Sequence, residues 1–152
     1  MKRKLVWAVA GAVATLALLA SGCGGGGGKA YKNLSKAEYA RILDGVCVSA
    51  NKKLASLGKP DMATLKEHGS EAVDIGKDLV KKIKKVTPPD ELKDTAKQFN
   101  EANQAVVDSL KKVVDAAKND DKAKFDEALS EAFNSGKESD ALATKLGAKG
   151  CA

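Results

Sequence analysis

The chain has few of the residues that most catalytic and metal sites use. It contains one histidine, His68, and three cysteines, and aromatic side chains make up only 4% of it. A di-iron site of the helical-bundle type needs two histidines and four carboxylates, so a single histidine excludes it. No Cys-x-x-Cys-His haem-attachment motif and no Gly-x-Ser-x-Gly nucleophile motif occurs. We therefore expect no catalytic residue, metal or cofactor, with His68 at the surface or at its boundary.

The chain also lacks a strong excess of charge of one sign. Of its 26 basic and 20 acidic residues, three basic ones lie within residues 1–22 and no acidic one does. The remaining 130 residues therefore carry a formal charge of only +3, from 23 basic and 20 acidic side chains. This weak balance gives no support for binding nucleic acid.

Patterns typical of β-strands are missing as well. No stretch alternates apolar and polar residues, and the chain has only three prolines. The commonest residues include Ala, Lys, Leu, Asp and Glu, most of which favour helices. The composition predicts an all-α protein of one domain.

The first 22 residues have the three parts of a secretory signal peptide. Lys2, Arg3 and Lys4 form a basic head, an uncharged run covers residues 5–20, and small residues lead to Cys23. A transmembrane helix is the alternative, and it needs about 20 apolar residues. Here the apolar run stops at Ser-Gly-Cys and a glycine tract, which favours cleavage.

The sequence LASGC, residues 19–23, resembles the lipobox of bacterial lipoproteins. In many such boxes Leu stands three residues before the cysteine, whereas this chain has Ala20 there and Leu19 one place earlier. The resemblance implies that Cys23 is lipidated and becomes the N-terminus, outside the cell membrane; the alternative is an ordinary secreted thiol. Gly24–Gly28 then forms a flexible tether, and residues 24–34 reach about 18 Å. The predicted division is residues 1–22 for the signal peptide, 23–34 for the lipidated linker and 35–152 for the folded domain.

Four stretches of the domain carry apolar residues at helical spacing. The first begins at a capping box, Ser35 to Glu38, with a hydrophobic staple between Leu34 and Tyr39, and ends at Gly58. The second follows Asp61 as its N-cap and stops at Thr87.

The third and fourth stretches follow the same rules. Thr87 is expected to cap the third, with Pro88 as its first residue and Asn119 at its end. The fourth runs from Asp121 to a C-cap at Gly147. Short loops between amphipathic helices predict an up-down-up-down four-helix bundle. An extended helical hairpin or an oligomeric coiled coil is the alternative.

Two cysteines remain once Cys23 is assigned to the lipid. Cys47 and Cys151 are expected to form a disulfide in an oxidising compartment, the alternative being two free thiols. An up-down-up-down bundle brings the end of the fourth helix to the same end as the start of the first, and Cys47 lies about 18 Å from that start. The bridge is therefore feasible provided that the fourth helix ends partway down the first.

A wider resemblance rests on YARILDGVCVSANKKLASL, TPPDELKD and KLGAKGCA. These segments are similar to small actinobacterial lipoproteins, in which a cysteine of the first helix and one at the C-terminus frame a helical domain. The resemblance implies a fold and a location outside the cell membrane, but no activity.

Two further features concern binding. Gly76, Asn103 and Gly136 are each expected about 22 Å from their helix starts, at apolar-stripe positions. They predict either a small, partly polar pocket or close helix approach with Asn103 fixing the register, and we favour the second. The run LVKKIKKV holds Lys81, Lys82, Lys84 and Lys85, which either contact anionic lipids or acidic wall polymers or form a solvated face that suits the helix dipole. We favour the solvated face at this point, because the other faces carry Asp and Glu.

From the sequence we therefore expect a lipid-anchored, extracytoplasmic module that binds and does not catalyse. Its partners would be the membrane, through the N-terminal lipid, and a protein or a cell-wall polymer. The alternative is a carrier of a small molecule in a mid-bundle pocket near Asn103. An exposed apolar patch would favour the interaction module, and a closed cavity beside Asn103 would favour the carrier.

Overall fold

The computed structural model describes residues 33–152. The predicted signal peptide, lipidated Cys23 and glycine tether lie outside the described residues. Within residues 33–152 the chain forms four α-helices and two short 3₁₀ helices and contains no strand. These are α1 (Lys36–Ser56), α2 (Met62–Ile83), η1 (Asp90–Leu92), α3 (Lys93–Lys118), α4 (Lys122–Leu146) and η2 (Lys149–Cys151).

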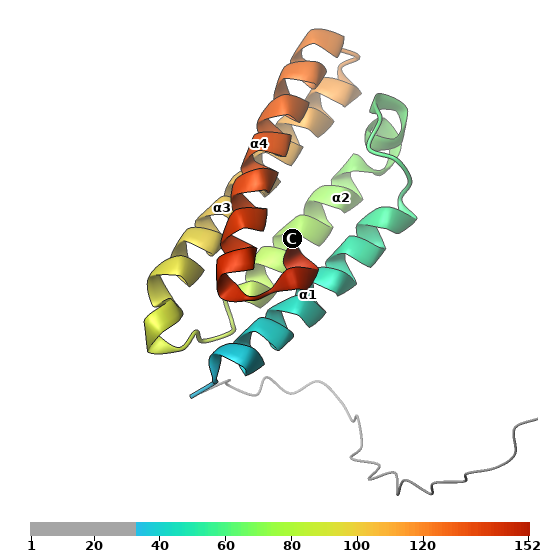
Figure 1. The fold of residues 1–152 in the computed structure, drawn as a ribbon. Helices are drawn as coiled ribbons and strands as arrows, with labels where there is room; N and C mark the ends of the chain where they lie inside the picture. Colours follow the sequence, from blue (N-terminus) through green and yellow to red (C-terminus); the bar gives the residue numbers. More distant parts are fainter. Residues whose placement is uncertain (1–32) are drawn as a thin grey trace, which may run out of the picture.

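The helices run up, down, up and down, so the predicted all-α bundle is confirmed (Figure 1). The bundle has two ends. The near end is the one where the described chain begins, and it holds Ser35, Ile83, Lys93 and Leu146. The far end holds the α1–α2 turn and the α3–α4 turn, with Ser56, Met62, Lys118 and Lys122.

Local capping explains where α1 begins and ends. The Ser35 hydroxyl accepts a hydrogen bond from the Glu38 amide at 3.3 Å, and the Glu38 carboxylate accepts one from the Ser35 amide at 2.9 Å. This capping box satisfies two amides that the first turn leaves without helical partners. The helix ends at Ser56 with Leu57 as its C-cap, and Gly58 follows with a φ of +105°, which glycine adopts without strain.

The remaining predicted caps are confirmed with one exception. Asp61 caps α2 by accepting from the Thr64 amide, and Asp121 caps α4 by accepting from the Lys124 amide. Gly147 ends α4 with a φ of +76°. The prediction that Thr87 caps the third helix, with Pro88 as its first residue, is wrong.

The third helix starts later because two prolines stand in sequence. Pro88 precedes Pro89, so its own backbone is pushed out of the helical region and cannot begin a helix. Pro89 is extended, with ψ of 153°, and η1 begins only at Asp90. The segment from Ile83 to Lys93 is therefore a longer connection than the sequence pattern suggested.

The core consists of two clusters, one at each end of the bundle. The near-end cluster includes Tyr39, Leu43, Ile83 and Phe99, each no more than 1% exposed. The far-end cluster includes Val113, Val114, Ala117 and Phe125, against which several half-buried leucines pack. The large side chains at the centres of these clusters lie within the four stretches that the sequence predicts to be helical.

The contact between α1 and the end of α4 is made largely by the C-terminal segment, which packs against both helices. After Gly147 the chain crosses from α4 to the middle of α1, where η2 packs (Figure 1). The Gly150 amide donates to the Asp44 carboxylate at 2.7 Å, and Ala148 is fully buried. The C-terminal tail therefore fills the space between α1 and α4 at the near end.

Candidate functional site

The predicted disulfide is present. Cys47 on α1 and Cys151 on η2 are bonded, with their Cα atoms 5.0 Å apart. Cys47 is 4% exposed and belongs to the near-end core. The bridge fastens the C-terminal tail to the middle of α1, and its buried sulfur on α1 indicates a structural role.

The three residues of the predicted mid-bundle layer lie in different surroundings. A Cβ added to Gly76 would lie 3.0 Å from a Val107 methyl, so α2 and α3 approach closely there. Asn103 is 8% exposed and donates from Nδ2 to the Phe99 carbonyl of its own helix at 2.8 Å. Gly136 is half-buried, and a Cβ added to it would meet nothing within 4 Å. None of the three lines any of the cavities described below, and a pocket between them stays a prediction.

His68 lies at the surface boundary, as expected. Its side chain is 42% exposed, and its Nε2 lies 3.5 Å from a carboxylate oxygen of Glu67. Within residues 33–152 no group of three His, Cys, Asp or Glu side chains is placed to hold a metal ion.

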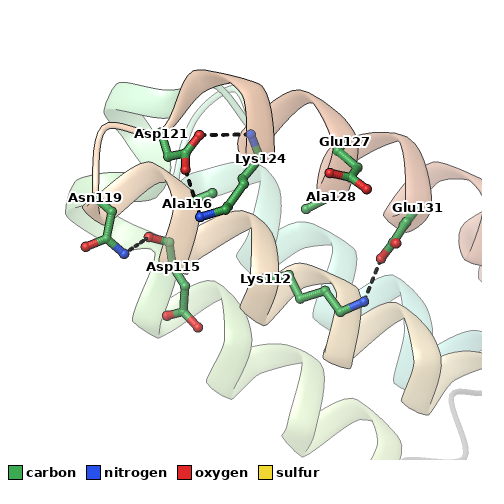
Figure 2. A pocket seen from close by; sticks show the side chains of 9 residues that line it. All are labelled: Lys112, Asp115, Ala116, Asn119, Asp121, Lys124, Glu127, Ala128 and Glu131. Carbon is green, nitrogen blue, oxygen red and sulfur yellow. Dashed lines mark hydrogen bonds and ion pairs between the residues drawn. The ribbon is translucent and has the colours of Figure 1, made fainter.

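A charged cleft of about 420 Å³ lies between α3 and α4 at the far end (Figure 2). Lys112 reaches across it to Glu131 at 2.7 Å, and the carboxylate raises the pKa of this lysine. Asp121 caps α4 and also pairs with Lys124 at 3.1 Å; the Lys124 amide hydrogen bond is the main cause that holds the pKa of this carboxyl below its usual range. The two lysines drawn in Figure 2 are therefore both paired with carboxylates, and the charges drawn there without an ion pair among the described residues are the carboxylates of Asp115 and Glu127.

A second cavity at the far end is almost entirely apolar. It measures about 340 Å³ and lies where α1 ends, α2 begins and α3 passes behind them. We call it the apolar groove; its lining is Leu54, Ala55, Leu57, Gly58, Lys59, Pro60, Thr64, Leu65, His68, Ala72 and Leu110. Ligand sites typically measure about 300–1,000 Å³ and are lined mainly by apolar side chains with a few polar groups.

The turn between α1 and α2 makes this groove. Gly58 and Pro60 take the chain out of α1 and across to Asp61, so Leu54 and Leu57 are only half covered. Lys59, Thr64 and His68 supply the polar groups that border the groove. An apolar floor with polar groups at its border is the usual anatomy of a protein interface.

The sequence predicts helices with apolar residues at helical spacing in these segments, but it does not predict the groove. A stripe shows that a residue is apolar, and it does not show whether a neighbouring helix covers it. Leu54, Leu57 and Leu110 are half-buried, whereas Leu65 on the next helix is 5% exposed. The glycine and proline of the turn were visible, but they predict a turn without indicating how far the helices separate.

Comparison with protein-family models, curated proteins and solved structures found no match to this chain. None of the helices within residues 33–152 has the length and apolar character required to cross a bilayer. The candidate site therefore rests on its own geometry.

Proposed function

We propose that the chain is a lipid-anchored, extracytoplasmic module that binds a partner protein through the apolar groove. The observation that carries this proposal is the groove itself. It is an open apolar cavity with a volume of about 340 Å³, lined by residues of three helices and the turn between α1 and α2. Its occupant would be two or three apolar side chains on a partner helix or loop, because grooves of this kind accept the apolar face of an amphipathic segment.

The position of the groove supports a partner that approaches the domain from the side opposite the proposed membrane tether. The described chain begins at the near end (Figure 1), and the residues that line the groove lie at the far end. Leu65 in the groove is 18 residues along α2 from Ile83, or about 27 Å at 1.5 Å per residue. A tether that joins the domain at the near end leaves the far end free for contact.

Mass spectrometry of the protein extracted from its own membrane tests the anchor. We expect acyl groups on a chain that begins at Cys23, and a gain of two hydrogens on reduction of Cys47–Cys151. A chain that keeps residues 1–22, or that carries no acyl group, would contradict the lipid anchor and leave the groove to be tested separately.

A photo-crosslinking amino acid at Thr64, tested in the native cells, examines the groove. We expect a discrete protein adduct that is lost when Ala55→Arg blocks the groove. Ala55 is exposed and lines the groove, and arginine is a good helix former, so the fold should persist. Ala141→Arg is the matched control, on an exposed face of α4, and it should leave the adduct unchanged.

Two results would contradict this proposal. One is the absence of an adduct, or an adduct that Ala55→Arg does not affect. The other is release of a small apolar molecule on denaturing the purified protein, if Ala55→Arg abolishes its binding. That outcome would favour a carrier whose ligand lies in the apolar groove, and not in the mid-bundle pocket near Asn103, instead of the interaction module.

A further inference from the structure

The second half of α2 carries a lysine-lined groove along the side of the bundle. It measures about 350 Å³, and its lining is Lys77, Val80, Lys81, Lys84, Lys85 and Gln104. All four lysines are exposed, and no carboxylate is among the lining residues. We call Lys81, Lys84 and Lys85 the basic face.

The three lysines of the basic face form no ion pair among the described residues. Their neighbours do: Lys77 pairs with Asp74 at 2.9 Å, and Lys82 pairs with Asp78 at 2.7 Å. Two acidic residues elsewhere at the near end are also paired, since Glu91 meets Lys36 at 3.3 Å and Asp90 meets Lys93 at 2.6 Å. Within residues 33–152, Asp94 in the first turn of α3 forms no such pair, and neither does Glu101, which lines a neighbouring cavity with Lys84. The basic face is thus a local excess of positive charge in a domain that is otherwise nearly balanced.

The position of the basic face at the near end would bring it close to the membrane. Lys84 and Lys85 follow the last residue of α2, at the end of the bundle where the described chain begins. The tether expected from Gly24 to Gly28 would join the membrane to this same end. A reach of about 18 Å keeps the near end close to the headgroup layer. Charges must approach to within about 8 Å to interact strongly at physiological ionic strength.

We propose that the basic face binds the anionic headgroups of the membrane that holds the lipid anchor. Contact would set the orientation of the domain, with the near end against the bilayer and the apolar groove directed away from it. The basic face is positively charged, and it lies at the end of the bundle where the tether joins the domain. Because the tether would hold this end near the membrane, anionic lipid is favoured over a soluble acidic polymer. This inference rests on the lipid anchor of the proposed function.

The experiment uses the lipidated protein in vesicles and a tryptophan as a probe. The only tryptophan, Trp7, lies in the predicted leader, so a chain that begins at Cys23 has none. Thr87→Trp places a probe beside the basic face at an exposed position whose predicted capping bond is absent. Ala63→Trp places a matched probe at an exposed position of the far end. A headgroup-labelled quencher lipid then reports which probe approaches the bilayer.

We expect quenching of the Thr87→Trp probe to be at least about fivefold stronger in phosphatidylcholine containing phosphatidylglycerol than in phosphatidylcholine alone. Neutralising the basic face with Lys81→Gln, Lys84→Gln and Lys85→Gln should remove this difference, as should high salt. Removing the same charge away from both the basic face and the apolar groove, with Lys52→Gln, Lys118→Gln and Lys122→Gln, should preserve it. The Ala63→Trp probe should stay unquenched in both membranes.

Equal quenching in neutral and anionic vesicles, or no change on neutralising the basic face, would overturn the proposal. The proposal would also be overturned if neutralising the basic face released the protein from an immobilised acidic polysaccharide but left quenching in the vesicles unchanged. The mass of the vesicle-bound protein separates these results from failure of the anchor. A chain that keeps Trp7 or lacks acyl groups contradicts the anchor, whereas an acylated chain without lipid-dependent quenching contradicts only the basic face.

Discussion

Close packing between α2 and α3 depends on Gly69. A Cβ added there would lie 2.6 and 2.7 Å from the two methyl carbons of Val114, which is 3% exposed. Valine has one strongly preferred rotamer in a helix, so Val114 cannot turn away easily. The glycine is therefore required by the approach of the two helices, despite its low helix propensity.

Gly69→Ala should lower the unfolding free energy by about 1–3 kcal/mol because of overpacking. Gly45→Ala is the control, since a Cβ there meets nothing within 4 Å on an exposed face of α1. That change should raise stability by up to about 1 kcal/mol through helix propensity. Chemical denaturation of both variants measures the difference, and a Gly69→Ala protein as stable as the parent would refute the packing argument.

Asn103 is a polar residue in an apolar stripe whose amide bonds within its own helix. Asn103→Leu should raise stability by about 1 kcal/mol, since leucine has the higher helix propensity and adds apolar burial. Thermal unfolding measures this. A loss of stability would instead indicate that the amide has a partner or ligand that favours the pocket interpretation.

At the scale of the element, side-chain caps fix where most of the helices begin. Ser35 forms the capping box of α1 with Glu38, and Asp61 and Asp121 cap α2 and α4. These signals were readable in the sequence because a cap involves residues three positions apart. The start of α3 was not, because two consecutive prolines delay helical structure until η1 at Asp90, and α3 itself begins at Lys93. How far α1 and α2 separate from α3 depends on side-chain packing over long sequence distances, so the apolar groove could not be predicted either.

The acidic caps make stability depend on pH in a predictable direction. The Thr64 amide hydrogen bond holds the pKa of Asp61 below its usual range, and the Lys124 amide does the same for Asp121. A carboxyl whose pKa is lower in the folded state stabilises the fold while ionised. This stability is present above the unfolded pKa, about 4, and is lost as the pH falls through the lower folded value.

We therefore expect the unfolding free energy to fall as the pH drops below about 5. The double variant Asp61→Asn and Asp121→Asn retains good caps without titrating, so its stability should fall less steeply over the same range. Urea denaturation at a series of pH values measures both slopes, and parallel slopes would show that the caps do not contribute.

At the scale of the whole molecule, the Cys47–Cys151 disulfide closes a loop with a sequence separation of 104 residues. Its existence was predictable from counting cysteines once Cys23 was assigned to the lipid. Its geometry depended on something the sequence did not reveal, namely that η2 packs against α1 and brings the tail to it.

Replacing both cysteines with alanine should lower stability by up to about 4.7 kcal/mol, the chain-entropy value for a loop of this size. Reductant should lower the melting temperature of the parent and leave the double variant unchanged. Calorimetry with and without reductant gives both values. Equal melting temperatures for the parent and the variant would mean that the fold does not depend on the bridge.

The same bond would have a mechanical consequence if the proposed anchor holds the protein by its N-terminus. A pull on the tether enters α1 at Lys36 and meets a covalent loop at Cys47, so only residues 36–46 of the described helices can be drawn out before the load reaches the bridge. That segment supplies an extended length of at most about 40 Å. The helices enclosed by the loop can lose their packing under load, but they cannot extend in series with the tether. Under a pull at the anchor, the domain would therefore extend only through residues 36–46, and the loop closed by the disulfide would not lengthen further.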